Sequence, residues 1–249
     1  MTTKREILPS DIMDMAAYAD ERAARRAHIS GVKRDRRIAV GPFATFYFES
    51  YDTMWMQIHE MLFVERGGEE QISGELNAYN PLIPNGKNLI ATLMFEIADG
   101  TVRARELARL GGIEKTIRIE LGENAIAAQP IADGVERTTD EGKTSAVHFL
   151  QFDFSPVKIE IFLDNAVRTV ISIDHSNYGH MAVIPEAARR ALGAEHRRRV
   201  EIEPQPFEPA ENLVDCILGA ALLIRILDPE QRLAAVMARE QPVEQRGAR

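Results

Sequence analysis

Residues 51–65 carry apolar side chains at the spacing of one helical face. The apolar positions recur three and four residues apart and are Met54, Trp55, Ile58, Met61 and Leu62. This spacing predicts an α-helix with one wide apolar side, which ends at Gly67 and Gly68. A helix of this kind has to be covered by other elements, so the chain needs a globular core.

Strand-like patterns dominate the middle of the chain. Apolar, β-branched and aromatic residues alternate or cluster in residues 37–40, 43–49, 89–98, 116–121, 124–129, 145–154 and 167–174. Two pairs of these segments are separated by Gly41-Pro42 and Gly122-Glu123, which favour tight turns. Residues 10–37 suit a further helix capped by Ser10 and Asp11. We therefore expect an α+β fold with a mainly antiparallel sheet packed against several helices.

One boundary stands out near the C-terminus. A charged run from residue 197 leads into Pro204, Pro206 and Pro209, a composition typical of a stiff linker. The sequence thus predicts an α+β domain over residues 1–196, a linker over 197–209 and a helical extension over 210–249. The apolar side of that extension is hard to leave exposed, so we expect it to fold back or to form a homo-oligomer.

Charge and cysteine content narrow the class of protein. The formal net charge of −8 at pH 7 weighs against binding to nucleic acid or to an anionic membrane. The most apolar stretch, residues 213–227, is interrupted by charges and is shorter than the roughly 20 residues that span a bilayer. Cys216 is the single cysteine, and the N-terminus lacks the apolar region of a signal peptide. We expect a cytoplasmic protein with no nucleic acid or membrane partner.

The positions of two histidines are the most informative chemical signal. Phosphate-loop, GxGxxG, GxSxG and HExxH signatures are all missing. His148 and His175 each share the apolar face of a predicted strand. One interpretation is two core histidines that bond to a carbonyl or carboxylate. The other is a site for an iron-like divalent metal, completed by Glu60 or Glu96, because two histidines and one carboxylate suffice for it.

Further polar residues could line such a site. They are Gln57, Tyr79, Asn80, Asp174 and Tyr178. Tyr79 and Asn80 also have a structural interpretation, because Asn before proline favours a turn and a tyrosine at a helix end often covers a core edge.

Ordered motifs along most of the chain resemble one bacterial family. They include Arg37-Ile38-Ala39-Val40-Gly41-Pro42, Phe48-Glu49, Tyr79-Asn80-Pro81, Thr144-Ser145-Ala146-Val147-His148 and Asp174-His175. Over about residues 4–195 the chain is similar to the family named domain of unknown function 3501. Genes of that family often lie near those for rubrerythrin and an iron–sulfur oxidoreductase. The resemblance therefore implies a redox or peroxide-related setting and a redox protein of this kind as partner.

Two functions stay open at this point. The first is a non-catalytic accessory or binding protein in such a pathway. The second is a small non-haem metal-dependent enzyme that uses His148, His175 and a carboxylate. The enzyme requires these side chains to converge to within about 2.0–2.2 Å of one point, whereas the binding protein does not.

Overall fold

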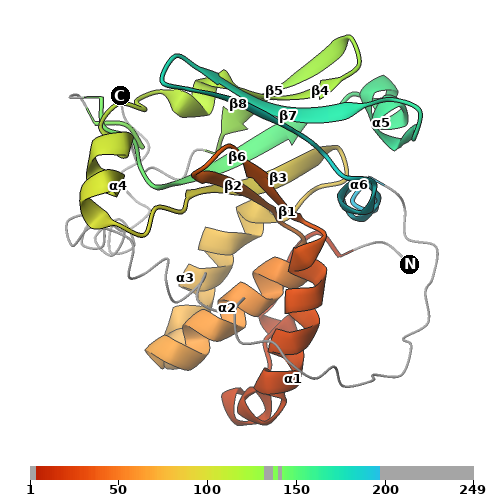
Figure 1. Cartoon of the computed structure of the whole chain (residues 1–249). Coiled ribbons are helices and arrows are strands. Elements are labelled where there is room, and N and C mark those ends of the chain that lie inside the picture. The colour runs from red at the N-terminus through yellow and green to blue at the C-terminus, as the bar shows by residue number, and fades with distance from the viewer. Residues whose placement is uncertain (1–3, 132–136, 140–141, 197–249) are drawn as a thin grey trace, which may run out of the picture.

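The computed structural model describes residues 4–131, 137–139 and 142–196 (Figure 1). The predicted linker over 197–209 and the predicted extension over 210–249, with Cys216, lie outside the described residues.

Eight antiparallel strands form one sheet in the order β1-β2-β3-β6-β5-β4-β7-β8. The sheet curls until β1 and β8, its two edges, lie side by side, so that it is nearly a barrel (Figure 1). The strands are β1 Arg37–Val40, β2 Ala44–Phe48, β3 Asn88–Phe95, β4 Ile117–Leu121, β5 Asn124–Pro130, β6 Val147–Asp153, β7 Thr169–His175 and β8 Tyr178–Val183. The fold is thus α+β with an antiparallel sheet, as the strand pattern predicted.

The inside of the barrel is a single apolar core. Alternate side chains of each strand point inward, which follows from the two-residue period of a β-strand. Phe46, Leu93, Leu150 and Phe152 are each fully buried there. Truncation of such a side chain to alanine typically costs about 2–5 kcal/mol. These residues therefore hold the strands around a common centre.

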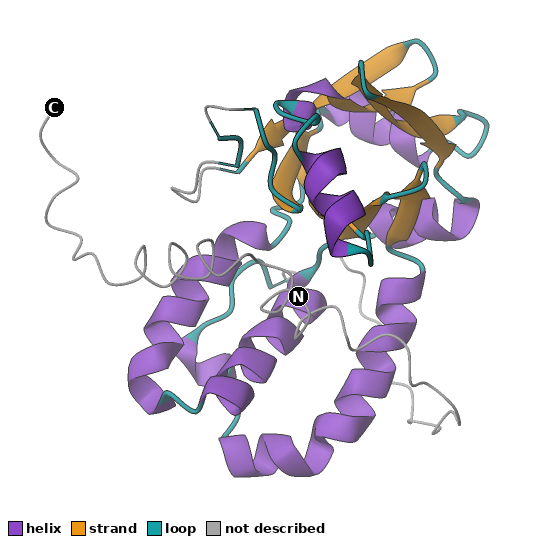
Figure 2. Ribbon diagram, turned by 60° about the vertical axis from the view of Figure 1, so that its left-hand side comes forward, coloured by secondary structure: helices purple, strands orange, loops and turns teal. Residues whose placement is uncertain are grey.

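A layer of three helices lies beside the barrel (Figure 2). These helices are α1 Met15–Arg34, α2 Tyr51–Glu65 and α3 Gly68–Tyr79. All eight residues of β3 are buried, because this strand is covered on both faces. Leu89 and Leu93 belong to the barrel core, whereas Ile90 packs with Ile58 and Leu62 of α2. The predicted apolar face of residues 51–65 thus binds the helical layer to the barrel.

The remaining elements are short. Helices α4 Gly100–Leu107, α5 Pro156–Leu163 and α6 Glu186–Gly193 lie around the barrel, and three 3₁₀ turns, η1 Pro9–Asp11, η2 Asn80–Leu82 and η3 Ile113–Thr116, connect elements. No helix in the described part of the chain is long and apolar enough to cross a membrane.

Helix α1 starts later than the sequence predicted, whereas α2 has the predicted bounds. Helix α1 begins at Met15, because the side chain of Asp14 accepts hydrogen bonds from the N–H groups of Ala16 and Ala17. The expected caps, Ser10 and Asp11, lie in η1 instead. Helix α2 ends at Glu65 as predicted, and its C-cap is Arg66, which adopts a left-handed conformation with φ of 56° directly before Gly67.

Candidate functional site

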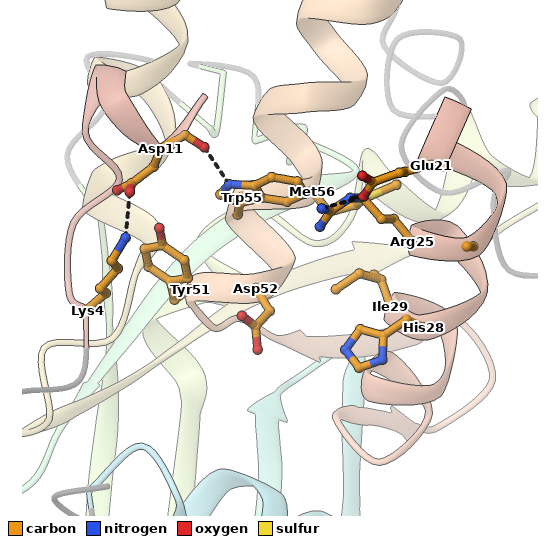
Figure 3. A pocket seen from close by; sticks show the side chains of 11 residues that line it. Lys4, Asp11, Glu21, Arg25, His28, Ile29, Tyr51, Asp52, Trp55 and Met56 are labelled. Carbon is orange, nitrogen blue, oxygen red and sulfur yellow. Dashed lines mark hydrogen bonds and ion pairs between the residues drawn. The ribbon is translucent and has the colours of Figure 1, made fainter. Parts of the chain in front are cut away.

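A pocket of about 660 Å³ opens between α1, α2 and the N-terminal segment (Figure 3). We call it the α1–α2 pocket. Its lining comprises Lys4, Asp11, Glu21, Ala24, Arg25, His28, Ile29, Tyr51, Asp52, Trp55 and Met56. Three segments that are separate in the sequence therefore build one concave surface, and its volume is in the range of roughly 300–1,000 Å³ that is usual for sites of small molecules.

Most charges of the α1–α2 pocket are paired with each other. Lys4 forms an ion pair with Asp11 at the N-terminal side, and Nε of Arg25 donates to Oε2 of Glu21 at 2.8 Å within α1. The backbone oxygen of Asp11 also accepts from Nε1 of Trp55 at 2.9 Å. These contacts attach the N-terminal segment to α2 and neutralise both cations of the lining.

Two titratable side chains of the lining have no such partner. Asp52 and His28 are exposed, and neither forms a hydrogen bond or ion pair with another described residue. Both lie at the lower side of the pocket in Figure 3. A carboxylate and an imidazole are therefore available to a ligand at the pocket mouth.

Aromatic and apolar side chains provide the rest of the surface. The rings of Trp55 and His59 are stacked with centroids 3.6 Å apart, and the guanidinium of Arg25 lies 4.7 Å from the centroid of Trp55. Met56 and Ile29 are buried beside them. Because these residues restrain each other, the indole of Trp55 keeps one orientation in the wall of the pocket.

Tyr51 adds a hydrogen-bond donor to this wall. Burial raises the pKa of the Tyr51 phenol to about 12, and the negative charge of Asp11 contributes in the same direction. The hydroxyl is therefore protonated across the physiological pH range.

His59 supports the pocket from behind. Its Nδ1 lies 2.7 Å from the carbonyl oxygen of Trp55, and its Nε2 accepts from the N–H of Met13 at 3.0 Å. The ring is thus neutral, with its hydrogen on Nδ1. Burial lowers the pKa of His59, which keeps it neutral. The residue connects the N-terminal segment to α2.

The structure places Glu60, a predicted metal ligand, in an ion pair with α1. Nε and Nη2 of Arg22 each donate to its carboxylate at 2.8 Å, and the hydroxyl of Tyr18 donates at 2.7 Å. Burial raises the pKa of Glu60, but the hydrogen bonds from Arg22 and Tyr18 outweigh this effect and hold the pKa below its usual value. The carboxylate oxygens of Glu60 thus accept hydrogen bonds from a guanidinium and a hydroxyl within the helical layer.

Glu96, the alternative carboxylate, lies on the outer side of β1 and β2. It accepts from Arg37 at 3.0 Å, from Thr45 at 2.6 Å and from Tyr47 at 2.6 Å. Burial raises the pKa of Glu96, and these hydrogen bonds more than reverse that change. Glu96 therefore fastens the end of β3 to the β1–β2 hairpin.

The two histidines have separate backbone partners. Nε2 of His148 lies 3.0 Å from the carbonyl oxygen of Ser145, and Nε2 of His175 lies 3.3 Å from that of Gly111. Burial lowers the pKa of His148 to about 4. Among the described residues no three or more His, Cys, Asp or Glu side chains are grouped so as to hold a metal ion. The structure thus does not bring His148, His175 and either glutamate together, because each glutamate is drawn to a basic partner in its own layer.

The other predicted lining residues occupy four different places. Asn80 accepts from and donates to the backbone of Ile7, Gln57 donates to the hydroxyl of Tyr79 at 3.4 Å, and Asp174 is in an ion pair with Arg118. Tyr178 joins the two edges of the barrel. None of these five residues lines the α1–α2 pocket.

A buried carboxylate that was not among the predicted site residues lies between the two layers. Glu49 accepts from the hydroxyls of Thr53 on α2 and Thr92 on β3, each at 2.7 Å. Glu49 connects β2, β3 and α2, so its role is to position the helical layer.

The residues of the α1–α2 pocket gave no site-like signal in the sequence. Asp52 and Trp55 belong to the helical pattern of residues 51–65, and Arg25 and His28 to a charged arm. Trp55 is the only tryptophan of the chain, which could have drawn attention to this helix. That its side chain is only half-buried became visible in the structure alone.

The fold and this site define a class of α+β proteins with a nearly closed antiparallel barrel and a pocket in a neighbouring helical layer. Within it the chain belongs to the family described as protein of unknown function DUF3501, whose model matches residues 6–196. The chain is also similar to a novel protein of unknown function from Burkholderia pseudomallei K96243, whose crystal structure has been solved. The two sequences are 33% identical, the match covers 76% of this chain and 98% of the Burkholderia chain, and the TM-score is 0.69. No curated protein matches the chain.

Proposed function

We propose that this chain is a binding protein whose α1–α2 pocket holds a small organic cation with an apolar body. The observation that carries the proposal is the carboxylate of Asp52, which is exposed at the mouth of a pocket of about 660 Å³ and makes no ion pair with a described residue. A ligand ammonium or guanidinium group would supply the missing partner.

The balance of charge in the lining supports a cation rather than an anion. Lys4 is neutralised by Asp11, and Arg25 by Glu21. Asp52 then remains as the uncompensated charge of the lining. An anion would meet this carboxylate without gaining a free cation, whereas an ammonium group would be attracted to it.

The apolar part of the lining supports a ligand with a hydrocarbon or aromatic body. Trp55, Met56 and Ile29 present aromatic and aliphatic surface next to Asp52. Contact with such surface supplies most of the affinity in small-molecule sites, while one or two polar groups set the orientation. Methionine beside tryptophan also adapts readily to different shapes.

This function is a form of the accessory or binding role expected from the sequence. A redox partner such as rubrerythrin or an iron–sulfur oxidoreductase, and a homo-oligomeric state, stay predictions. No observation in the described residues favours the metal-dependent enzyme, because Glu60 and Glu96 are engaged elsewhere.

Intrinsic fluorescence offers a direct test, because Trp55 is the only tryptophan and lines the pocket. The probes are phenethylamine and hexylamine, compared with phenethyl alcohol, hexanol and hexanoate. We expect saturable fluorescence changes with the amines and weaker binding of the alcohols and of hexanoate. Asp52→Asn should weaken amine binding about fivefold, which corresponds to ~1 kcal/mol for an exposed ion pair.

The matched control is Glu69→Gln, an exposed acidic residue in the first turn of α3. It removes one negative charge outside the pocket and should leave amine affinity unchanged. Equal affinity for amines and alcohols, or equal loss in both variants, would contradict the proposal.

A further inference from the structure

Three flat side chains form a layered stack in the wall of the α1–α2 pocket. The imidazole of His59 and the indole of Trp55 have centroids 3.6 Å apart and planes inclined by 29°. The guanidinium of Arg25 lies over the same indole, 4.7 Å from its centroid. The close stacking of His59 fills one face of the indole, and His59 is not part of the pocket lining, whereas Arg25 is. Arg25 is therefore the layer that the stack presents to the pocket.

The two inner layers of the stack are held in place by hydrogen bonds. His59 is fully buried, its Nδ1 bonds to the carbonyl oxygen of Trp55, and its Nε2 accepts from the N–H of Met13. Nε1 of Trp55 donates to the carbonyl oxygen of Asp11 at 2.9 Å. Because these rings are already ordered, a ligand that contacts the stack loses little binding energy to the ordering of side chains.

Glu21 holds the third layer by one edge. Nε of Arg25 donates to Oε2 of Glu21 at 2.8 Å, and Nη2 of Arg25 lies 2.6 Å from a carboxylate oxygen of the same residue. The indole of Trp55 covers one face of the guanidinium. The side chain of Arg25 is nevertheless 37% exposed and lines the pocket. The part of the guanidinium that stays open to the pocket is thus its second flat face.

A flat guanidinium face favours flat partners. Arginine stacks on aromatic rings through cation–π attraction and through the contact of two planes, whereas the ammonium of lysine is compact and strongly hydrated. An aliphatic chain contacts the same face without this electrostatic gain. An aromatic ring is therefore the ligand group that extends the stack best.

We propose that the α1–α2 pocket selects an aromatic amine, whose ring stacks on the open face of Arg25 while its ammonium group pairs with Asp52. This inference rests on the proposed function, because it names the class of cation that the same pocket binds. Arg25 and Asp52 lie in the same pocket lining (Figure 3). The carboxylates of Glu21 and Asp52 balance the charges of the guanidinium and of the ligand's ammonium group.

A second arginine of α1 shows what distinguishes Arg25. The guanidinium of Arg22 lies 4.5 Å from the ring centroid of Phe63 on α2, so both arginines cover an aromatic ring. Nε and Nη2 of Arg22 are bonded to the two carboxylate oxygens of Glu60 on α2, and Arg22 is not part of the pocket lining. The ion pair of Arg22 joins two helices, whereas Arg25 pairs within α1 and faces the pocket.

Two amines with the same skeleton test the stacking. Phenethylamine has a flat aromatic ring and 2-cyclohexylethylamine has a saturated one, and burial of apolar surface alone does not favour the aromatic ring. We expect the full chain to bind phenethylamine about two- to fivefold more tightly, which is the gain typical of an exposed cation–π contact. Calorimetric titration with each amine measures this ratio.

Arg25→Lys keeps the positive charge next to Glu21 but removes the flat face. The preference for phenethylamine should therefore disappear in this variant, while both amines still bind. The matched control is Arg190→Lys, because Arg190 forms an ion pair with Glu186 at the same spacing of four residues, on α6 and outside the pocket lining. This control should keep the preference of the original chain.

The outcomes separate this inference from the proposed function. An equal preference in Arg25→Lys and in the original chain, or tighter binding of 2-cyclohexylethylamine to the original chain, overturns the stacking on Arg25 and leaves the amine pocket in place. Failure of both amines to bind overturns both proposals. Nitrogen-15 NMR of the arginine side chains gives a second readout. Phenethylamine should shift the Nε–H signal of Arg25 upfield through its ring current, and an equal shift with the saturated amine overturns the stacking.

Discussion

The hydroxyl of Tyr178 on β8 donates to the carbonyl oxygen of Val40 on β1 at 2.8 Å. The hydroxyl oxygen of Tyr178 in turn accepts from the N–H groups of Phe43 and Ala44, each at 2.9 Å. One side chain thus joins the two edges of the sheet where no hydrogen-bonded strand ladder does so.

Tyr178→Phe should lower the free energy of unfolding by about 1–3 kcal/mol, because buried backbone groups lose their partner. Amide hydrogen exchange at Phe43 and Ala44 should accelerate, since both amides become unpaired. Tyr47→Phe, which also removes a tyrosine hydroxyl but at an exposed site, is the control and should not affect these two amides. Unchanged exchange in Tyr178→Phe would show that the hydroxyl does not hold the barrel edges together.

The contact of Glu60 with Arg22 and Tyr18 should make stability depend on pH. The pKa of Glu60 is lowered in the folded chain, so its contribution is present above the unfolded pKa of about 4.3 and is lost as the pH falls through the folded pKa. Glu60→Gln should therefore cost about 1–3 kcal/mol at pH 7, and this difference should shrink at acidic pH. Chemical unfolding at several pH values measures it, with Glu69→Gln as the exposed control. A constant difference at all pH values would contradict the ion-pair interpretation.

The stacked rings of Trp55 and His59 should report the protonation of His59. The pKa of this buried histidine is lowered, so the ring stays neutral as the pH falls past the pKa of about 6.5 that it has in the unfolded chain. Below that pH the unfolded chain binds a proton that the folded chain does not, and the free energy of unfolding therefore decreases. A charged imidazolium quenches a stacked indole. Tryptophan fluorescence should therefore decrease only below about pH 6.5, and His59→Gln should lack this step. A step at higher pH, or one that persists in the variant, would exclude His59 as its source.

The carboxylate of Glu49 should depend on its two threonine donors. Thr92→Val keeps the shape of the side chain but removes a hydrogen bond of 2.7 Å to a buried carboxylate. We expect a loss of about 1.5–3 kcal/mol, the range for hydrogen bonds to charged groups. Thr101→Val, at an exposed position of α4, should change stability by less than about 0.5 kcal/mol. Thermal or urea unfolding distinguishes the two variants, and equal effects would mean that Glu49 is satisfied without Thr92.

Metal analysis tests the remaining enzyme hypothesis. Glu60 and Glu96 are held by Arg22 and Arg37, and so we expect protein purified without chelator to contain no metal that depends on the histidines. The comparison is with the His148→Ala, His175→Ala double variant. Stoichiometric metal in the original chain that disappears from a folded double variant would restore the metal site.

Local sequence patterns predicted the elements well where one period dominates. Helix α2, Tyr51–Glu65, and strand β1, Arg37–Val40, have the expected bounds. Periodicity predicts these bounds because the buried side of a helix or strand depends on the spacing of apolar residues within a few neighbouring positions. The start of α1 was missed because Asp14 competes with Ser10 and Asp11 as a cap, and all three are good capping residues.

Local sequence patterns did not predict contacts between residues that are distant in the sequence. The apolar strand face indicated correctly that His148 is buried. One interpretation of the sequence had both histidines contact a carbonyl, but it did not specify the carbonyl oxygens of Ser145 and Gly111. Arg22 and Glu60 are 38 residues apart in the sequence, and nothing near Glu60 shows that it faces a cation rather than water.

The sequence by itself determined the antiparallel α+β class, the apolar face of α2 and membership in the family, because these depend on local periodicity and ordered motifs. The tertiary structure alone decided the rest. It brought Lys4 and Asp11 to Trp55, left Asp52 without a partner, and placed Arg25 over the indole of Trp55. The physical reason is that a charge or hydrogen-bond partner is chosen by the packing of whole layers, and the short-range preferences of a residue do not contain that information.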